Sequence, residues 1–280
     1  MVESLEHSEP KQQLISTYNL VSAGYDKEPF TRLCAERLVQ LARMRRGEKV
    51  LNVATGTGWA AIAAARIVGP SGRVVGVDIA RDMLAQARQK IDSAHLTNVE
   101  LLEADAEHPD FPDNSFDIVT CASAIFFLPD MLAALREWLR VTKTGGRVAF
   151  STFGDTLFQP MRDMLMARLR NYGISPPSHW PNQRRLAEPE KCRDFLGEAG
   201  LENVAVYSEQ LGYHVSTANE YWDDSVLWSG TAHGMLSQLS PDKLKKLRME
   251  HSSEVRALAT GQGIWMSVPG IFSLGEKPPK

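Results

Sequence analysis

The chain has 280 residues, a formal net charge of −3 and a hydrophobic fraction of 43%. This balance predicts a globular protein with a sizeable core, and it offers no basic stripe for nucleic acid or for an anionic membrane surface. Cys34, Cys121 and Cys192 lie far apart, which argues against a disulfide framework or a metal site and suits a reducing compartment. The polar N-terminus and the lack of a long apolar run predict a cytoplasmic protein without a membrane span.

Helices are expected first, over 13–23 and 29–44, and an alternation of strands and helices follows them. We expect strands at 49–53, 73–78, 98–103, 116–121 and 147–152, and helices at 57–67, 81–93 and 129–141. The strands are continuous runs of Val, Ile and Leu, as expected when both faces of a sheet are covered. The alternation predicts a parallel sheet with right-handed crossovers.

The pattern changes after Phe153. The expected elements are a Met-rich helix at 157–171, an irregular segment at 174–187, a helix at 189–199, a strand at 202–209, helical structure over 217–260 and an apolar strand within 264–275. Pro269 lies inside that last run and cannot donate to a sheet ladder, so we expect the ordered strand mainly after it.

The most informative stretch runs from Lys49 to Gly58, where an apolar strand ends in a glycine-containing turn before an Ala-rich helix. Glycine permits positive φ angles, and the helix N-terminus offers unpaired N–H groups, so this turn predicts a bound ligand. Gly56-x-Gly58-x-x-Ala61 matches the dinucleotide fingerprint. Asp78, twenty positions after Gly58, can accept both ribose hydroxyls of an adenosine; alternatively, it caps the helix over 81–93.

A second carboxylate distinguishes between adenosine ligands. The third strand ends in Leu102-Glu103-Ala104-Asp105-Ala106, and a carboxylate there can accept from the adenine amino group. Nicotinamide-dependent enzymes do not usually need this group, and the bulky Trp59 hinders close approach of a pyrophosphate to the turn.

These motifs together resemble those of the class I S-adenosylmethionine-dependent methyltransferases, and more narrowly the ubiquinone- and menaquinone-biosynthesis type that acts on small molecules. The resemblance covers residues 16–153. It rests on the run 50–58, Val75-Gly76-Val77-Asp78-Ile79 with Met83-Leu84, Glu103-Ala104-Asp105-Ala106, Asn114-Ser115-Phe116-Asp117-Ile118-Val119 and Lys143-Thr144-Gly145-Gly146-Arg147.

The resemblance implies an α/β fold with a doubly wound Rossmann-like sheet of seven strands, the last one antiparallel, and helices on both faces. Residues 1–45 would form N-terminal lid helices and residues 46–154 the cofactor-binding core. Residues 155–280 would supply cap helices and complete the sheet with strands six and seven.

The resemblance further implies S-adenosylmethionine as the cofactor. The expected binding residues are Tyr25, Asn52, Ala54, Thr55, Gly56, Gly58, Asp78, Ile79, Met83, Asp105, Ala106, Ala122 and Ser123. Tyr25-Asp26 matches an N-terminal element that closes over the cofactor. Two positions depart from the family pattern: Asn52 replaces the usual acid at the end of the first strand, and Ala54 replaces the first glycine.

The expected reaction is methyl transfer to a small, largely hydrophobic or aromatic metabolite, with secondary metabolism as its setting. Transfer from a sulfonium needs alignment more than acid–base chemistry, so no catalytic residue is certain; Tyr18, Tyr25, His179 and His214 are weak candidates. The acceptor pocket is expected from 1–30, 155–185 and 210–260, which are rich in Met and aromatic residues.

Several alternatives stay open on the sequence. A nicotinamide-dependent oxidoreductase would keep the glycine turn and Asp78, and a cyclase, an isomerase or a non-catalytic binding protein would keep the fold and the cofactor. O-, N- and C-methylation are not distinguished. The partners expected are the small-molecule acceptor and no nucleic acid, and a homodimer is compatible with the sequence.

Overall fold

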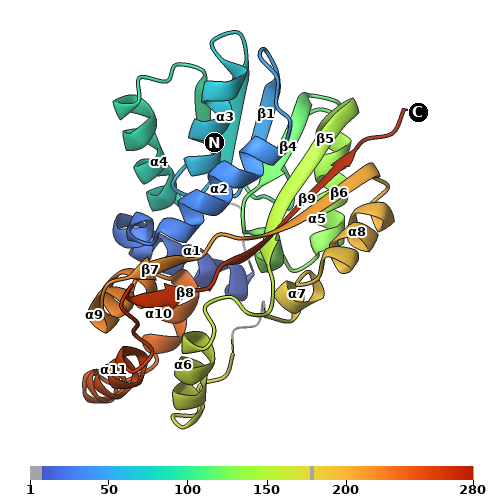
Figure 1. The fold of residues 1–280 in the computed structure, drawn as a ribbon. Helices are drawn as coiled ribbons and strands as arrows, with labels where there is room; N and C mark the ends of the chain where they lie inside the picture. Colours follow the sequence, from blue (N-terminus) through green and yellow to red (C-terminus); the bar gives the residue numbers. More distant parts are fainter. Residues whose placement is uncertain (1–7, 177–179, 280) are drawn as a thin grey trace.

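The computed structural model describes residues 8–176 and 180–279, and its central feature is a seven-stranded sheet (Figure 1). The strand order is β3-β2-β1-β4-β5-β9-β6. The strands are β1 (Lys49–Val53), β2 (Arg73–Asp78), β3 (Val99–Glu103), β4 (Phe116–Cys121), β5 (Thr142–Phe153), β6 (Glu202–Gln210) and β9 (Pro269–Glu276). β9 is antiparallel to both of its neighbours, and the first five strands pair in parallel. The expected seven-stranded sheet with an antiparallel last strand is therefore confirmed.

Helices cover both faces of the sheet. They are α2 (Pro29–Leu41), α3 (Trp59–Val68) and α4 (Arg81–Ser93) on one side and α5 (Met131–Val141) and α8 (Pro189–Glu198) on the other. Alternate residues of β1 serve the two cores, because Val50 packs with α2 and α3 while Leu51 packs with α5 and α8. Burial on both faces explains why these strands are continuously apolar.

A largely helical cap lies beyond one end of the sheet (Figure 1). Its elements are α1 (Glu9–Val21), η1 (Ser22–Lys27), α6 (Met161–Arg170), α7 (Trp180–Arg185), α9 (Ala218–Glu220), η3 (Tyr221–Val226), α10 (Gly230–Leu236), α11 (Pro241–Arg256) and a hairpin of β7 (Tyr213–Val215) with β8 (Ile264–Met266). Much of the cap packs around its own core, in which Met161, Trp222 and Leu247 are buried.

The segments after Phe153 differ in detail from the expectation. The helical stretch 217–260 is broken into α9, η3, α10 and α11, because the side chain of Ser229 caps α10 and Pro241 begins α11. The segment 174–187, expected to be irregular, contains the short helix α7.

The apolar run 264–275 is two strands rather than one. Its first three residues form β8, which pairs with β7 outside the main sheet. Pro269 is the first residue of β9 and lies opposite Gln210, a position at the start of a strand where proline is tolerated.

Candidate active site

A cavity of about 610 Å³, called here the large cavity, lies where β1, β2, β3 and β4 end. All of the expected cofactor-binding residues line it except Asn52 and Gly58: Tyr25, Ala54, Thr55, Gly56, Asp78, Ile79, Met83, Asp105, Ala106, Ala122 and Ser123. The carboxyl ends of adjacent parallel strands meet at one edge of the sheet, which brings these separate motifs together.

The turn after β1 is shaped by backbone conformation and close packing. Ala54, Gly56 and Gly58 have φ angles of 48°, 55° and 89°. A Cβ on Gly58 would lie 2.9 Å from the Cβ of Ala87 on α4, so a larger residue would push α3 and α4 apart. A Cβ on Gly56 would meet nothing within 4 Å, because this glycine faces the open cavity. Gly58 therefore shapes the turn from behind, while Gly56 leaves room for a ligand.

Asp78 connects the turn to the start of α4. Its Oδ2 accepts a hydrogen bond from the Gly56 N–H at 2.7 Å, and its Oδ1 accepts from the Ala80 N–H at 2.9 Å. Burial raises the pKa of Asp78 above its usual value, although both hydrogen bonds oppose that shift. Asp78 is not the N-cap of α4, because Ala80 holds that position and receives no side-chain capping hydrogen bond there. Asp78 instead holds the backbone just before the helix, and it lines the cavity as the ribose interpretation requires.

Asn52 lies behind the turn and is fully buried. Its Nδ2 donates to the Thr120 carbonyl at 3.2 Å and to the Thr120 hydroxyl at 3.1 Å, and its Oδ1 accepts from the Thr55 hydroxyl at 2.6 Å. An amide provides both the donor and the acceptor that this arrangement needs, whereas an ionised carboxylate provides only acceptors.

Asp105 is contacted by the N-terminal helix. Lys11 Nζ on α1 lies 2.5 Å from Asp105 Oδ2 and also pairs with Glu107. The N–H of Glu107 donates to Asp105 Oδ1 at 3.0 Å. Lys11 is a contact that the sequence did not reveal, because it lies 94 positions away in a segment with no motif.

The N-terminal segment also forms part of a wall between two cavities. The rings of Tyr18 and Tyr25 lie 5.9 Å apart, and those of Tyr18 and Phe127 lie 5.7 Å apart. Five residues line both the large cavity and a second one: Tyr18, Tyr25, Thr31, Ser123 and Phe127.

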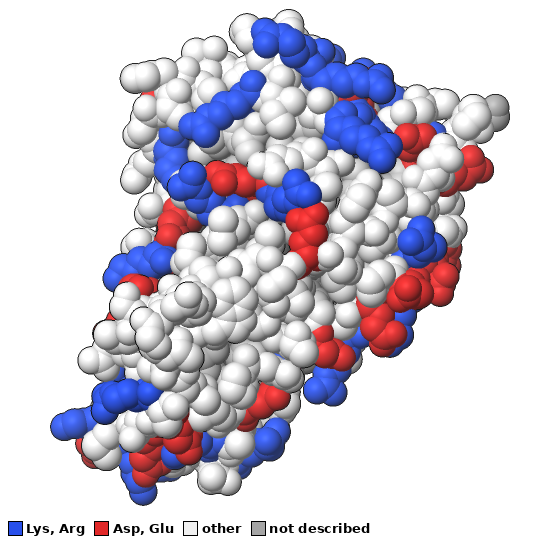
Figure 2. Space-filling model, in the orientation of Figure 1, with Lys and Arg blue, Asp and Glu red and all other residues white. Residues whose placement is uncertain are grey.

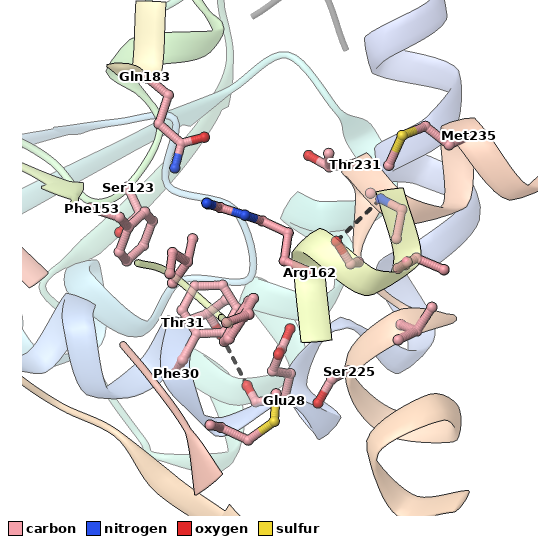
Figure 3. Close-up of a pocket in the computed structure, with 18 of the residues that line it drawn as sticks. Glu28, Phe30, Thr31, Ser123, Phe153, Arg162, Gln183, Ser225, Thr231 and Met235 are labelled. Carbon is pink, nitrogen blue, oxygen red and sulfur yellow. Dashed lines mark hydrogen bonds between the residues drawn. The ribbon is translucent and has the colours of Figure 1, made fainter. Parts of the chain in front are cut away.

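The second cavity, called here the small cavity, has a volume of about 150 Å³ and is mostly aromatic and aliphatic (Figure 3). Its only acidic and basic side chains, among the described lining residues, are Glu28 and Arg162. Glu28 is 4% exposed, and its Oε1 accepts from the Tyr213 hydroxyl at 3.4 Å. Burial raises the pKa of Glu28 well above its usual range.

Sequence reasoning missed Glu28 and Arg162. Glu28 precedes Pro29 at the start of a helix, a pattern typical of a surface cap, yet its side chain makes no capping hydrogen bond. Arg162 is one of several charged residues on an amphipathic helix. Neither position carries a local signal that distinguishes it from a solvated side chain.

The weak catalytic candidates have different surroundings. Tyr18 and Tyr25 lie on the shared wall, and His179 lies outside the described residues. His214 is exposed and lines neither cavity; its ring centroid lies 4.9 Å from that of Trp265, with the two rings tilted by 58°. A different histidine, His251, is buried beneath the small cavity, where its Nε2 lies 3.1 Å from the Tyr221 hydroxyl.

The fold and the large cavity define the class of a Rossmann-like, S-adenosylmethionine-dependent methyltransferase. Residues 29–167 match the ubiE/COQ5 methyltransferase family. The ubiquinone/menaquinone biosynthesis C-methyltransferase UbiE of Cronobacter sakazakii is 34% identical over 189 residues, which cover 63% of this chain and 75% of that protein. The chain belongs to the ubiE/COQ5 methyltransferase family, uses S-adenosylmethionine as its cofactor and transfers a methyl group to a small molecule.

One further relative agrees with this assignment, and one solved structure shares the fold. The aklanonic acid methyltransferase DauC of a Streptomyces species is 36% identical over 151 residues, covering 53% of this chain and 68% of that protein. The solved structure of YcgJ from Bacillus subtilis shares the fold with a TM-score of 0.57 and 24% identity, covering 89% of this chain and 99% of that one. Family membership decides against a nicotinamide-dependent oxidoreductase.

No helix among the described residues is long and apolar enough to cross a membrane. No cluster of three or more His, Cys, Asp and Glu side chains in the same part of the chain is arranged to hold a metal ion.

Proposed function

We propose that the large cavity holds S-adenosylmethionine and that the small cavity holds the methyl acceptor. The observation that carries this proposal is the shared wall, since a methyl group passing between the two molecules has to cross near Tyr18, Tyr25 and Ser123. Asp78 would accept from the ribose hydroxyls and Asp105 from the adenine amino group, while the turn 54–58 would lie under the methionine part. The open space at Gly56 and the two carboxylates fit such a cofactor.

The acceptor that suits the small cavity is planar and largely apolar. Phe30 lies edge-on to Phe153 and to Phe158, with ring centroids 5.6 and 5.1 Å apart, and such walls favour flat rings. The two relatives are named for ubiquinone and menaquinone biosynthesis and for aklanonic acid. A quinone-type or polyketide-type ring system is therefore the acceptor we propose.

Glu28 is proposed as the general base. The cofactor supplies an activated methyl group, so the protein has to align the acceptor and remove its proton. Glu28 is the one carboxyl group among the described residues that line the small cavity. When ionised, it would take the proton from an acceptor hydroxyl as the new bond to carbon forms, and Tyr213 and Ser225 would hold its orientation.

The proposed setting is the cytoplasm, without a nucleic-acid partner. All three cysteines are free and buried, which suits a reducing compartment. Figure 2 shows Lys and Arg gathered toward the sheet end of one face and mixed with Asp and Glu elsewhere, but the whole chain carries a formal net charge of −3, which does not favour a polyanionic partner. A homodimer stays a prediction, which size-exclusion chromatography with light scattering would test.

Calorimetric titration with S-adenosylhomocysteine tests the cofactor part of the proposal. Asp78→Ala should weaken binding by about 2 kcal/mol, from lost charge-assisted hydrogen bonds. Asp92→Ala, an exposed change on α4, should leave the affinity unchanged. Unchanged affinity in Asp78→Ala, or tighter binding of NADH by the wild type, would contradict the proposal.

Transfer of labelled methyl groups to a panel of aromatic hydroxy compounds tests the reaction itself.

A further inference from the structure

Ser123 lies where the two cavities meet. It follows the end of β4, and it lines both the large cavity and the small cavity. Figure 3 shows it beside Phe153, on the side of the small cavity from which Gln183 projects, while Glu28 lies on a different wall. A methyl group that passes from the large cavity to the small one would therefore travel close to the Ser123 side chain.

The backbone of Ser123 is in the left-handed region, with a φ angle of 56°. Glycine adopts this conformation without a steric cost, whereas another residue keeps it only when its surroundings impose it. Among the described residues, seven other than glycine have a positive φ angle, and Ser123 is the one of them that lines both cavities. Such residues concentrate at functional sites, so the conformation points to a role for the serine side chain that glycine would not fill.

Hydrogen bonds from two neighbouring strands hold this turn. Ser151 on β5 is fully buried, and its Oγ accepts from the Ser123 N–H at 2.9 Å. The same Oγ lies 3.1 Å from Ser123 Oγ, which is within hydrogen-bond distance. In addition, the sulfur of the buried Cys121 on β4 is hydrogen-bonded to the backbone of Ala124 and Ile125. These contacts fix the backbone of the turn and place the Ser123 hydroxyl beside a buried hydroxyl.

We propose that Ser123 donates a hydrogen bond to an oxygen of the acceptor, at the edge of the acceptor that faces the cofactor. This inference rests on the proposed function, in which the small cavity is the acceptor site. A hydroxyl group has one hydrogen and two acceptor lone pairs. Ser151 Oγ accepts from a backbone N–H, so its own hydrogen can be donated to Ser123 Oγ, which leaves the hydrogen of Ser123 to point into the cavities.

The acceptor group that fits this donor is a carbonyl or an ionised hydroxyl, because both accept hydrogen bonds. When Glu28 takes a proton from the acceptor, negative charge develops on the ring system and spreads to its oxygens. A donor that is already in place stabilises this charge without having to reorganise. Ser123 would then be a catalytic residue, and Ser151 would be the positioning residue that directs its hydroxyl.

The test is calorimetric titration of three aromatic ketones at saturating S-adenosylhomocysteine, each matched with the compound that lacks its carbonyl oxygen. The pairs are 1-indanone with indane, 1-tetralone with tetralin, and 4-chromanone with chroman. Ser123→Ala should weaken the binding of at least one ketone about fivefold and leave its partner compound unchanged. Ser123→Gly should have the same effect, which separates the loss of the hydroxyl from the relief of backbone strain. Ser151→Ala should weaken the same ketone by a smaller factor.

The matched control is Ser253→Ala, an exposed change on α11, which should leave every affinity unchanged. Two results would overturn the inference. One is wild-type affinity for every ketone in Ser123→Ala or in Ser123→Gly, including the case in which no ketone binds. The other is an equal loss for both members of every pair, which is what a purely structural role would produce. Failure of the wild-type protein to bind S-adenosylhomocysteine contradicts the proposed function instead, so the two failures are distinguishable.

Discussion

The carboxylate of Asp26 accepts a hydrogen bond from the hydroxyl of Thr57 at 2.6 Å, although the two residues lie 31 positions apart. The same oxygen accepts from Trp59 Nε1 at 2.8 Å, and the other oxygen pairs with Lys90 on α4. The Asp26 side chain thus connects the N-terminal segment to the glycine turn, to the start of α3 and to α4. This contact explains how residues before the sheet come to close one side of the large cavity.

Removing the hydrogen bonds and the ion pair of Asp26 should weaken cofactor binding. We expect Asp26→Ala to raise the dissociation constant of S-adenosylhomocysteine about tenfold, which corresponds to about 1.4 kcal/mol. Limited proteolysis should cut α1 and η1 faster in the variant than in the wild type. Calorimetry measures the affinity, and Asp92→Ala serves again as the control. An affinity equal to that of the wild type would show that the segment closes without Asp26.

Asn52→Asp should destabilise the protein despite restoring the acid usual in the family. The change removes the donor to the Thr120 carbonyl and places an ionised oxygen against it in a buried site. We expect a loss of about 2 kcal/mol in the free energy of unfolding at pH 8. At pH 5 the deficit should shrink, because the introduced carboxyl is then more often protonated and can donate.

Urea unfolding at the two pH values measures this effect, with the exposed Asn171→Asp as control. Stability equal to that of the wild type at pH 8 would mean that the network behind the turn tolerates a charge.

Because the carboxyl group of Glu28 is buried, its ionisation should lower the free energy of unfolding as the pH rises. Its pKa is raised in the folded protein, while in the unfolded chain it ionises near a pH of about 4.3. The stability that the neutral form contributes is therefore complete below a pH of about 4.3 and is lost as the pH rises through the folded pKa. Glu28→Gln should remove this dependence, whereas Glu36→Gln, on the helix α2 that follows Glu28, should keep it.

The corresponding kinetic result concerns the proposed base. The rate of methyl transfer should rise with pH as Glu28 ionises, and this rise should disappear in Glu28→Gln. A rise of the same size at the same pH in the variant would assign the proton transfer to another group.

Protonation of the buried His251 imidazole should lower the free energy of unfolding in mild acid. Burial lowers its pKa to about 4, against about 6.5 in an unfolded chain. The contribution of the neutral imidazole to the free energy of unfolding is complete above a pH of about 6.5. It is lost as the pH falls to about 4, by about 3 kcal/mol in total. The difference in unfolding free energy between wild type and His251→Gln, measured at pH 7 and pH 4.5, isolates this effect. An NMR titration of the imidazole near pH 6.5 would contradict it.

The fold class, and the edge of the sheet at which the large cavity lies, could be predicted from the sequence because their signals are local. Each strand, with the turn or carboxylate that follows it, occupies one short stretch, and parallel strands bring these endings to one edge. Asp78 and Asp105, which line one cavity, could be placed at the same edge without knowledge of any long-range contact. The split of 264–275 into two strands was missed, because its pairing with β7 depends on a distant segment.

The surroundings of Glu28, Arg162 and Asn52 were decided by tertiary structure alone. Glu28 precedes α2 and Arg162 lies on α6, and only the packing of these distant segments brings both side chains to the same small cavity. Asn52 likewise depends on Thr120, a residue 68 positions away on the next strand of the sheet. Sequence by itself determined the sheet, the glycine turn and the carboxylates at the strand ends, since these follow from neighbouring residues. The contacts that hold the turn, and the placing of two charged side chains in the small cavity, depended on burial, which exists only after distant elements have packed together.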